Sequence, residues 1–427
     1  MRLRRIRWKI FWGKRTRVFQ TMGHDVSLLP GNISRNQSWR SKMLKKITLD
    51  NFRSFKNMVT VELTKTNYNI LSYNAADNGV LKGCIFVGAN CSGNPTIIRG
   101  IKLLLDLLFS EKIPDVGSFL CVFGERRQYS VEYEFIIENE VIRYSFEVDT
   151  EKELISEKLY LDDKMLLDRM GISAKSYIAD PNGADYRSEV SKDTLFLRTL
   201  YFNTKFAFNP VLSAWIDFLK GSAYINMQHE RQIIHYGKTD VSISRYLDNV
   251  FRETVNRFFD NHGFEQSIVI NCDTQDGTPF STGDTDIENM ILVKHKGIKL
   301  PIPFAQESAG NQSFLRILPA FLTVINNGGM LLIDAFSGAF HNDLESLLVR
   351  YFMEKSNHSQ LLFVSHSTNL LSNSILRPDQ EYSVEFRNEE GSSVKRFSSE
   401  QPRSEQNIEK MYLSGVFGGL PDYGDIR

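Results

Sequence analysis

The sequence predicts an α/β fold in which a glycine-containing loop joins a buried strand to a helix. An apolar run over residues 83–87 leads directly into a loop that begins at Gly88 and contains Gly93. Isoleucine and leucine then recur at helical spacing over residues 97–108. Two later apolar runs each lead to a polar residue, Asp334 and His366, and ligands bind at such strand ends in parallel α/β sheets.

The composition is that of a globular protein with two to three domains or lobes. The chain has 427 residues, of which 42% are hydrophobic and 24% are charged. No stretch approaches the roughly 18–20 consecutive apolar residues that a membrane span needs. The cysteines have neither C-x-x-C pairing nor metal-ligand spacing. We therefore expect a cytoplasmic protein with no membrane segment.

Basic residues are concentrated at the beginning of the chain. Residues 1–42 contain eleven of the 51 Lys and Arg but only one of the 51 Asp and Glu, so the rest of the chain is net acidic. We interpret residues 1–42 as a disordered leader. There are two alternatives: residues 1–42 are a basic arm that binds nucleic acid, or they are upstream sequence translated from an early start codon. The acidic body does not favour DNA binding through phosphate contacts, although DNA remains a candidate partner.

The alternation of apolar residues divides the rest of the chain into three segments. Residues 43–163 are predicted to be an N-terminal lobe with the glycine loop and a β-meander over 128–163. Residues 164–299 are predicted to be a mixed α/β insertion, an arm or lid, with helices near 209–220 and 241–262. Residues 300–427 form the predicted C-terminal lobe. We expect the Gly88 loop and Asp334 to lie on neighbouring strands of one central sheet.

The loop has the outline of a P-loop, G-x-x-x-x-G-K-[ST], in which backbone N–H groups and a helix N-terminus hold phosphates. Two of its positions depart from that pattern, because Asn94 replaces the lysine and Pro95 replaces the serine or threonine. The candidate nucleotide-binding residues here are Gly88, Ala89, Asn90, Cys91, Ser92, Gly93, Asn94, Pro95 and Thr96.

The order of motifs resembles the ABC-type ATPases of the RecF/SMC branch, P-loop NTPases whose heads hold the nucleotide. Within that branch it resembles the stand-alone AAA-family ATP-binding proteins associated with abortive infection and phage defence. The resemblance covers most of 43–427. It rests on residues 49–55 (LDNFRSF), 88–96, 307–310 (ESAG), 331–334 (LLID) and 363–366 (FVSH).

The resemblance implies ATP and Mg²⁺ as cofactors and a pair of chains that sandwiches the nucleotide. Thr96 would reach the α-phosphate, and Ser308 with Gly310 would close over the γ-phosphate from the partner chain. Asp334 would hold Mg²⁺ through water, and Gln128 is a further candidate on the magnesium side. His366 would sense the γ-phosphate.

Two of these residues have simpler interpretations. Asp334 could be a helix cap, and His366 could be a histidine packed at a strand end.

Three positions lack groups that ATP hydrolysis uses in that family. Asn94 removes a positive charge beside the phosphates, and Pro95 removes a hydroxyl ligand of Mg²⁺ together with a backbone N–H. Ala335 stands where the family has the glutamate that polarises the attacking water, so no general base is evident. We therefore expect weak nucleotide binding and slow or absent hydrolysis.

The predicted function is ATP-dependent switching of a defence-linked or DNA-linked complex, with the chain acting as a homodimer or heterodimer. The alternative is a non-catalytic scaffold that pairs with an intact ATPase or with an effector such as a nuclease or toxin. A third interpretation, the nucleotide-binding subunit of a membrane transporter, is disfavoured by the long insertion and by the opening at residues 51–55.

Overall fold

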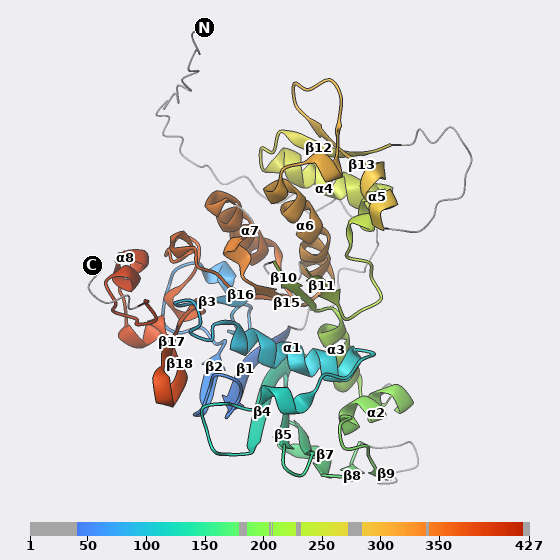
Figure 1. The fold of residues 1–427 in the computed structure, drawn as a ribbon, viewed down its shortest axis with the longest axis vertical. Helices are drawn as coiled ribbons and strands as arrows, with labels where there is room; N and C mark the ends of the chain where they lie inside the picture. Colours follow the sequence, from blue (N-terminus) through green and yellow to red (C-terminus); the bar gives the residue numbers. More distant parts are fainter. Residues whose placement is uncertain are drawn as a thin grey trace. The chain divides into compact units, whose positions relative to one another are not determined.

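The computed structural model describes residues 41–178, 186–204, 206, 208–227, 232–271, 284–338 and 341–421. Most of the predicted leader, residues 1–40, therefore lies outside the described residues. Within the described ranges the chain forms one large antiparallel sheet, one mixed sheet with a parallel centre, a small three-stranded sheet and the helices that pack on them (Figure 1). This mixed α/β architecture confirms the predicted fold class.

The antiparallel sheet contains the predicted β-meander and extends beyond it. The meander was predicted to end at residue 163, but three further strands continue it to Glu189. In spatial order the sheet consists of β2 (Val59–Glu62), β1 (Lys42–Asp50), β4 (Gln128–Ile137), β5 (Glu140–Asp149), β6 (Leu154–Leu161), β7 (Lys164–Met170), β8 (Ser173–Ser176) and β9 (Tyr186–Glu189).

The mixed sheet carries the strands that position the site. Its order is β11 (Gln232–His235), β10 (Ala223–Asn226), β15 (Gly329–Asp334), β16 (Ser359–Val364), β3 (Gly83–Val87), β17 (Glu381–Arg387) and β18 (Gly391–Arg396). The five strands from β10 to β17 are parallel. The prediction that the Gly88 loop and Asp334 lie on neighbouring strands is wrong, because β16 pairs with both β3 and β15 and separates them. All three strands nonetheless end at the same edge.

Two apolar cores cover the two faces of this sheet, because successive side chains of a strand point to opposite faces. Phe86, Leu332 and Leu362 face the core shared with the antiparallel sheet and with α1 (Pro95–Phe109), α2 (Phe196–Thr204) and α3 (Pro210–Lys220). Ile85, Leu331 and Leu361 face the other core. That core contains α4 (Asn249–Asn261), α6 (Ala309–Asn327), α7 (Asn342–Lys355) and α8 (Ile408–Leu413). Figure 1 shows α1 and α3 on one side of the sheet and α6 and α7 on the other.

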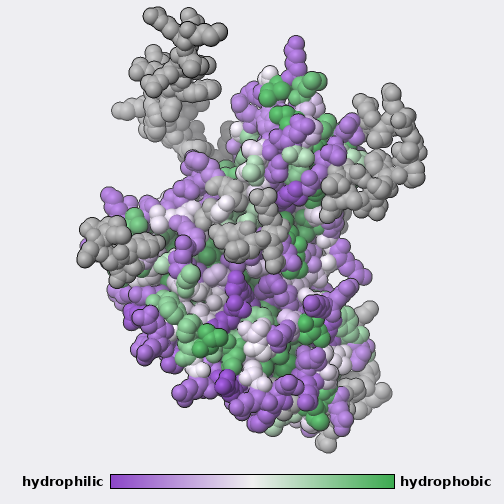
Figure 2. All heavy atoms as spheres, in the orientation of Figure 1, coloured by the Kyte–Doolittle hydropathy of each residue, from purple (hydrophilic) through white to green (hydrophobic). Residues whose placement is uncertain are grey.

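The remaining elements lie around α4. A small sheet of β12 (Gln266–Ile270), β13 (Ile291–His295) and β14 (Ile302–Pro303) packs with α4 and with α5 (Asp284–Met290) (Figure 1). Figure 2 shows small groups of hydrophobic residues among hydrophilic ones on the face in view. In the part of the chain that is described, no helix is long and apolar enough to cross a bilayer.

The predicted lobe boundaries both fall between strands that pair with each other. The boundary at 163/164 lies inside the β6–β7 hairpin, and the boundary at 299/300 lies between β13 and β14. In addition, β10 comes from the predicted insertion but adds a strand to the mixed sheet. The ranges 43–163, 164–299 and 300–427 stay a prediction about segments of the chain, and the described residues between 41 and 421 form one compact unit.

Candidate functional site

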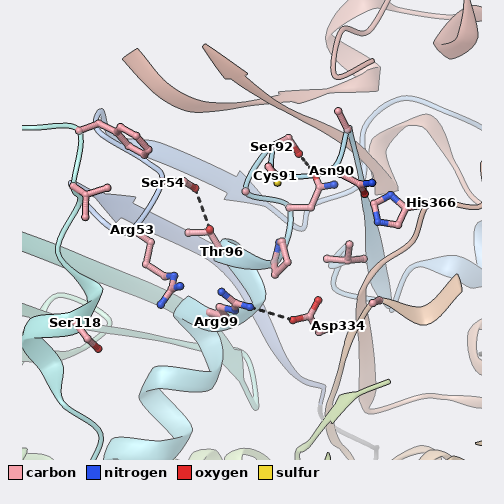
Figure 3. A pocket seen from close by; sticks show the side chains of 18 of the residues that line it. Arg53, Ser54, Asn90, Cys91, Ser92, Thr96, Arg99, Ser118, Asp334 and His366 are labelled. Carbon is pink, nitrogen blue, oxygen red and sulfur yellow. Dashed lines mark hydrogen bonds and ion pairs between the residues drawn. The ribbon is translucent and has the colours of Figure 1, made fainter. Parts of the chain in front are cut away.

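The carboxyl edge of the mixed sheet brings most of the predicted site residues into one cavity. Strand β3 leads into the glycine loop (residues 88–94), β16 leads to His366, and β15 ends at Asp334. The cavity at this edge has a volume of about 570 Å³ (Figure 3). It is lined by residues 89–96 together with Arg53, Ser54, Arg99, Ser118, Leu120, Val122, Phe123, Asp334, Ala335, Val364 and His366.

The path of the glycine loop depends on positive φ angles and on contacts with the C-terminal part of the chain. Cys91 has φ of 67° and Gly93 has φ of 91°. A Cβ on Gly93 would lie 2.3 Å from Ser54 Oγ and 2.6 Å from Ser392 Oγ, so this position has no room for a side chain. Ser392 Oγ also donates a 2.6 Å hydrogen bond to the carbonyl of Ser92. These contacts fix the loop as it enters α1.

Asn94, at the lysine position of the P-loop pattern, is used inside the loop. Its side-chain amide donates to the Gly88 carbonyl at 3.2 Å, and its Oδ1 accepts from the Ser92 hydroxyl at 2.9 Å. Asn94 is 3% exposed. Its polar atoms therefore close the loop on itself and add no positive charge to the cavity.

The next two residues begin the helix. Pro95 is the first residue of α1, where its missing N–H is not needed by the helix. Thr96 is buried, and its hydroxyl lies 3.0 Å from Ser54 Oγ. The loop and the segment that contains Ser54 are thus joined at the cavity wall.

Asp334 contacts a cation that lines the cavity, Arg99, and a buried phenol, Tyr224. Its Oδ2 lies 3.7 Å from Arg99 Nη2 and accepts a 3.5 Å hydrogen bond from the Tyr224 hydroxyl (Figure 3 shows the Arg99 contact). Burial, together with the negative charge of Asp334, raises the pKa of Tyr224 to about 12. Tyr224 therefore stays protonated and donates to the carboxylate.

Ala335, at the position of the lost glutamate, lines the cavity in a left-handed conformation with φ of 60°. It is 5% exposed. Among the described residues that line the cavity, Asp334 is the only carboxylic acid. The cavity wall therefore offers no second carboxylate that could act as a general base on water.

Two arginines that line the cavity, Arg53 and Arg99, were missed at the level of sequence. Arg53 follows Asn51 and Phe52 in a tight turn, and Arg99 lies one helical turn after Thr96 on α1. Both guanidinium groups face the same cavity, and burial, with a smaller effect of the charge of Arg99, lowers the pKa of Arg53. Helical spacing from Thr96 was the signal that could have identified Arg99, since residues three apart share a helix face.

Ser308 and Gly310 are not part of this cavity in the same chain. Ser308 caps α6, and its hydroxyl accepts a 3.3 Å hydrogen bond from the backbone N–H of Asn311. Both Ser308 and Gly310 are exposed at the beginning of the helix.

Gln128 is also outside the cavity. Its side-chain amide donates a 2.9 Å hydrogen bond to Asp149 Oδ2 on the adjacent strand β5. This bond is the main reason that the pKa of Asp149 is lowered to about 2. The structure thus gives Gln128 a partner within the antiparallel sheet and does not bring it to Asp334.

The donor set does not suit a magnesium ion. Mg²⁺ prefers oxygen ligands in octahedral geometry, and in nucleotide sites a carboxylate and a hydroxyl of the protein hold it together with water and the phosphates. In this cavity the one carboxylate, Asp334, lies beside Arg99, and Pro95 has no side-chain donor. Within the described ranges no group of three or more His, Cys, Asp or Glu is arranged to hold a metal. By contrast, the loop amides and two arginines suit a polyphosphate.

A glycine loop between a buried strand and a helix, at the carboxyl edge of a parallel sheet, is the arrangement of the phosphate site in P-loop NTPases. Residues 85–372 match the family model described as "AAA domain, putative AbiEii toxin, Type IV TA system". Because the match covers more than half of the chain, the protein belongs to this family and is an ATPase of the AAA type by membership.

Several solved structures are similar to this chain. One is an SMC head domain from Thermotoga maritima, with 16% identity, 82% of this chain and 97% of that chain covered, and a TM-score of 0.42. Another is the SmcHead bound to the C-winged helix domain of ScpA, with 15% identity, the same coverage and a TM-score of 0.47. A third, the Smc head with an extended coiled coil bound to the C-terminal domain of ScpA, derives from Pyrococcus furiosus. It has 12% identity, a TM-score of 0.44, and 83% and 96% coverage. No curated protein matches the chain.

Proposed function

We propose that this chain binds the phosphates of ATP in the cavity around the glycine loop and hydrolyses the nucleotide slowly or not at all. The observation that carries this proposal is the loop itself. It keeps the strand–loop–helix path of a phosphate site, while Asn94 directs its polar atoms into the loop. In the proposed complex, backbone N–H groups of residues 90, 91, 93 and 94 face the phosphates, since those of Ala89 and Ser92 donate to the carbonyls of Gly419 and Ala89. Thr96 lies near the α-phosphate, and His366 lies near the γ-phosphate.

The expected loss of hydrolysis follows from the groups that line the cavity. A positioned general base contributes roughly 10²–10⁴-fold to a rate, and Ala335 cannot supply one. A charge beside the developing phosphate charge is a further large contribution, and Asn94 carries none. Both deficits act on the chemical step more than on binding. Such a site can therefore lose hydrolysis and still bind the nucleotide.

The biological role proposed here is that of an ATP-dependent switch in a defence-linked or DNA-linked complex of the cytoplasm. The family description supports the link to defence, since it names a putative AbiEii toxin and a toxin–antitoxin system. This role comes by analogy with the family and not from the geometry of the cavity.

Pairing of two chains is part of the proposal. Ser308 and Gly310 are exposed and lie outside the chain's own cavity, which is the arrangement that a sandwich across two chains requires. The partner could be a second copy or an intact ATPase.

The experiment that tests this function restores the three missing groups. The variant Asn94→Lys, Pro95→Thr, Ala335→Glu should bind ATP more tightly than the wild type and should gain turnover by at least about tenfold, because it regains a cation, a hydroxyl and a general base. Position 335 already accommodates a Cβ at φ of 60°, so glutamate adds little backbone strain. The matched control carries Asn94→Gln, Pro95→Ala and Ala335→Gln, which changes the same positions without adding charge.

A second function, that of a non-catalytic scaffold for an effector such as a nuclease or toxin, is favoured by the same departures. It predicts that the restored variant gains neither ATP binding nor turnover, while the wild type still dimerises or binds its effector. Calorimetric titration with ATP and sedimentation of both variants distinguish the two functions.

A further inference from the structure

We propose that Arg99 supplies the positive charge of this phosphate site in place of the lost lysine. In the absence of ligand Arg99 pairs with Asp334, and a bound polyphosphate replaces Asp334 as its partner. The inference deepens the proposed function and rests on it. Asp334 then pairs with the Arg99 side chain and does not bind magnesium, so binding of the polyphosphate requires no metal.

Positive charge reaches the cavity from arginine side chains. Asn94 is buried and bonded to the loop, so it cannot neutralise a phosphate. Arg99 and Arg53 line the same cavity as the loop, and Figure 3 shows both guanidinium groups on the side of the cavity next to Thr96. Arginine binds phosphate through two parallel N–H···O bonds, which a neutral amide cannot reproduce.

Asp334 holds Arg99 only loosely. The Nη2–Oδ2 distance of 3.7 Å exceeds that of a direct hydrogen bond, and the Arg99 side chain is 36% exposed. An ion pair with this geometry contributes little to stability because solvent screens it. A phosphate carries more negative charge than one carboxylate, so Arg99 can exchange partners at low cost.

Arg53 adds a second positive charge to the same space. Both arginines line the cavity, and Figure 3 shows their guanidinium groups near each other beside Thr96, so two like charges share one space. Burial and the nearby charge of Arg99 lower the pKa of Arg53 accordingly. An anion placed between them relieves this repulsion. Arg53 therefore favours occupation of the cavity by a polyphosphate, whereas Arg99 is the group whose partner changes.

Asp334 and Arg99 should then have opposite effects on binding. Removal of the Asp334 charge by Asp334→Asn releases Arg99 to bind the anion, so polyphosphate affinity should rise. A magnesium ligand at Asp334 would give the reverse result, because loss of the ligand weakens metal-dependent binding.

The test measures binding of a fluorescent ATP analogue, ADP and inorganic tripolyphosphate to the full chain, in EDTA and in Mg²⁺. Wild-type affinity in EDTA should stay within about threefold of that in Mg²⁺. Arg99→Ala should weaken binding at least about tenfold, or about 1.4 kcal/mol, in both buffers. Arg99→Lys should recover part of this loss because it keeps the charge. The control, Arg143→Ala, removes an arginine of similar exposure that pairs with Asp163 on the antiparallel sheet, and it should leave binding unchanged.

A double-mutant cycle separates a direct role of Asp334 from one through Arg99. Asp334→Asn should tighten binding severalfold in the wild-type background, and most of this gain should vanish in the Arg99→Ala background. Equal gains in both backgrounds, weaker binding by Asp334→Asn, or an Arg99→Ala affinity equal to that of Arg143→Ala would overturn this inference.

Failure of the inference can be told apart from failure of the proposed function. If the wild type binds the probes but Arg99→Ala binds them equally well, the role of Arg99 is wrong and the phosphate site stands. If the wild type binds none of the three probes in either buffer, the proposed function itself fails.

Discussion

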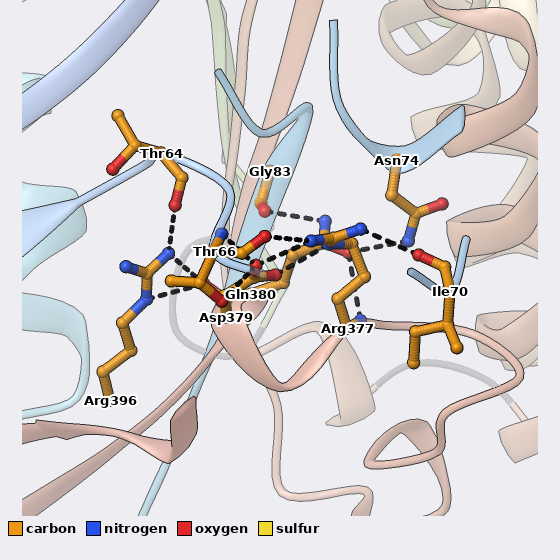
Figure 4. A network of polar contacts seen from close by, with 9 residues as sticks. All are labelled: Thr64, Thr66, Ile70, Asn74, Gly83, Arg377, Asp379, Gln380 and Arg396. Carbon is orange, nitrogen blue, oxygen red and sulfur yellow. Dashed lines mark hydrogen bonds and ion pairs between the residues drawn. The ribbon is translucent and has the colours of Figure 1, made fainter. Parts of the chain in front are cut away.

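Two of the arginine–aspartate pairs in this molecule have opposite surroundings, and their difference separates a structural contact from a functional one. The buried pair, Arg377 and Asp379, joins Nη2 to Oδ2 and Nε to Oδ1, each at 2.8 Å, and both residues are at most 2% exposed (Figure 4). The cavity pair, Arg99 and Asp334, has one contact of 3.7 Å and an arginine that is about one-third exposed. The first pair is closed to solvent and ligand, and the second faces a cavity.

The surroundings of the buried pair complete the contrast. Arg377 also donates to the Ile70 carbonyl at 2.8 Å, and Asp379 accepts from the backbone N–H of Thr66 at 2.6 Å. Gln380 donates to the Gly83 carbonyl, so the network fixes the start of β3 (Figure 4). Burial alone would raise the pKa of Asp379, but hydrogen bonds from Arg377 and Thr66 outweigh it and lower that pKa. This tightly bonded pair holds the beginning of the strand that leads to the glycine loop, whereas a loosely held pair is able to exchange partners.

The largest expected effect comes from breaking the buried pair. Arg377→Ala should lower the free energy of unfolding by about 3–5 kcal/mol, because it leaves the Asp379 carboxylate buried without its cation. Arg99→Ala should lower it by about 0–1 kcal/mol, since that ion pair is partly exposed. Urea denaturation of both variants measures the difference. Equal losses would remove the distinction between the two pairs.

An intermediate effect is expected at the glycine loop. Gly93→Ala should destabilise the protein by roughly 1–3 kcal/mol, because it adds a strained φ to a contact of 2.3 Å with Ser54 Oγ, and nucleotide binding should be lost with it. The control is Gly263→Ala, at φ of 73° with no atom within 4 Å of the added Cβ. That variant isolates the cost of the backbone conformation. If Gly263→Ala is as destabilising as Gly93→Ala, the close contacts of the loop contribute nothing.

The effect that is smallest over any one pH unit is a pH dependence at the buried network. Burial, reinforced by the charge of Asp379, raises the pKa of Glu381 well above its ordinary value of 4.5, and its oxygens have no hydrogen-bond partner among the described residues. The folded state therefore keeps a proton that the unfolded state releases. Stability falls as pH rises above about 4.5, until the raised pKa is passed, by at most about 1.4 kcal/mol per pH unit.

Glu381→Gln mimics the protonated carboxyl group and should remove this decline. The variant should match the wild type near pH 4 and exceed its stability at pH 8, as measured by urea denaturation across that range. An unchanged slope between pH 5 and 8 would show that Glu381 is not the group that titrates. The Asp379 carboxyl acts in the opposite direction, because its lowered pKa contributes stability that is lost as pH falls.

Sequence patterns were sufficient for the elements next to the cavity. The strand over 83–87 and a helix over 97–108 were predicted because an unbroken apolar run and a 3.6-residue period are strong local signals. The short strands β7–β10 were missed, since four to seven residues with mixed polarity carry little periodicity. Strand order was also beyond the sequence, because the position of β16 between β3 and β15 depends on crossovers and not on local pattern.

The site shows the same division between local and long-range information. The convergence of the glycine loop, Asp334 and His366 on one cavity followed from strand ends that share an edge, while their chemical roles remain predictions. The contact between Arg99 and Asp334 joins two residues that are far apart in the chain, so it required the folded sheet. Likewise, the inward hydrogen bonds of Asn94 depend on the path of the loop and could not be read from its motif.

The proposed function requires that the phosphate site binds ATP but does not hydrolyse it at ordinary rates. The most direct test measures ATP turnover and ATP binding by the purified chain under the same conditions. We expect saturable binding with turnover far below the roughly 1–10³ s⁻¹ that is typical of enzymes, and no further loss of turnover in Asp334→Asn. Turnover at ordinary rates that Asp334→Asn abolishes would contradict the proposal, because Asp334 would then be serving catalysis in spite of Asn94, Pro95 and Ala335.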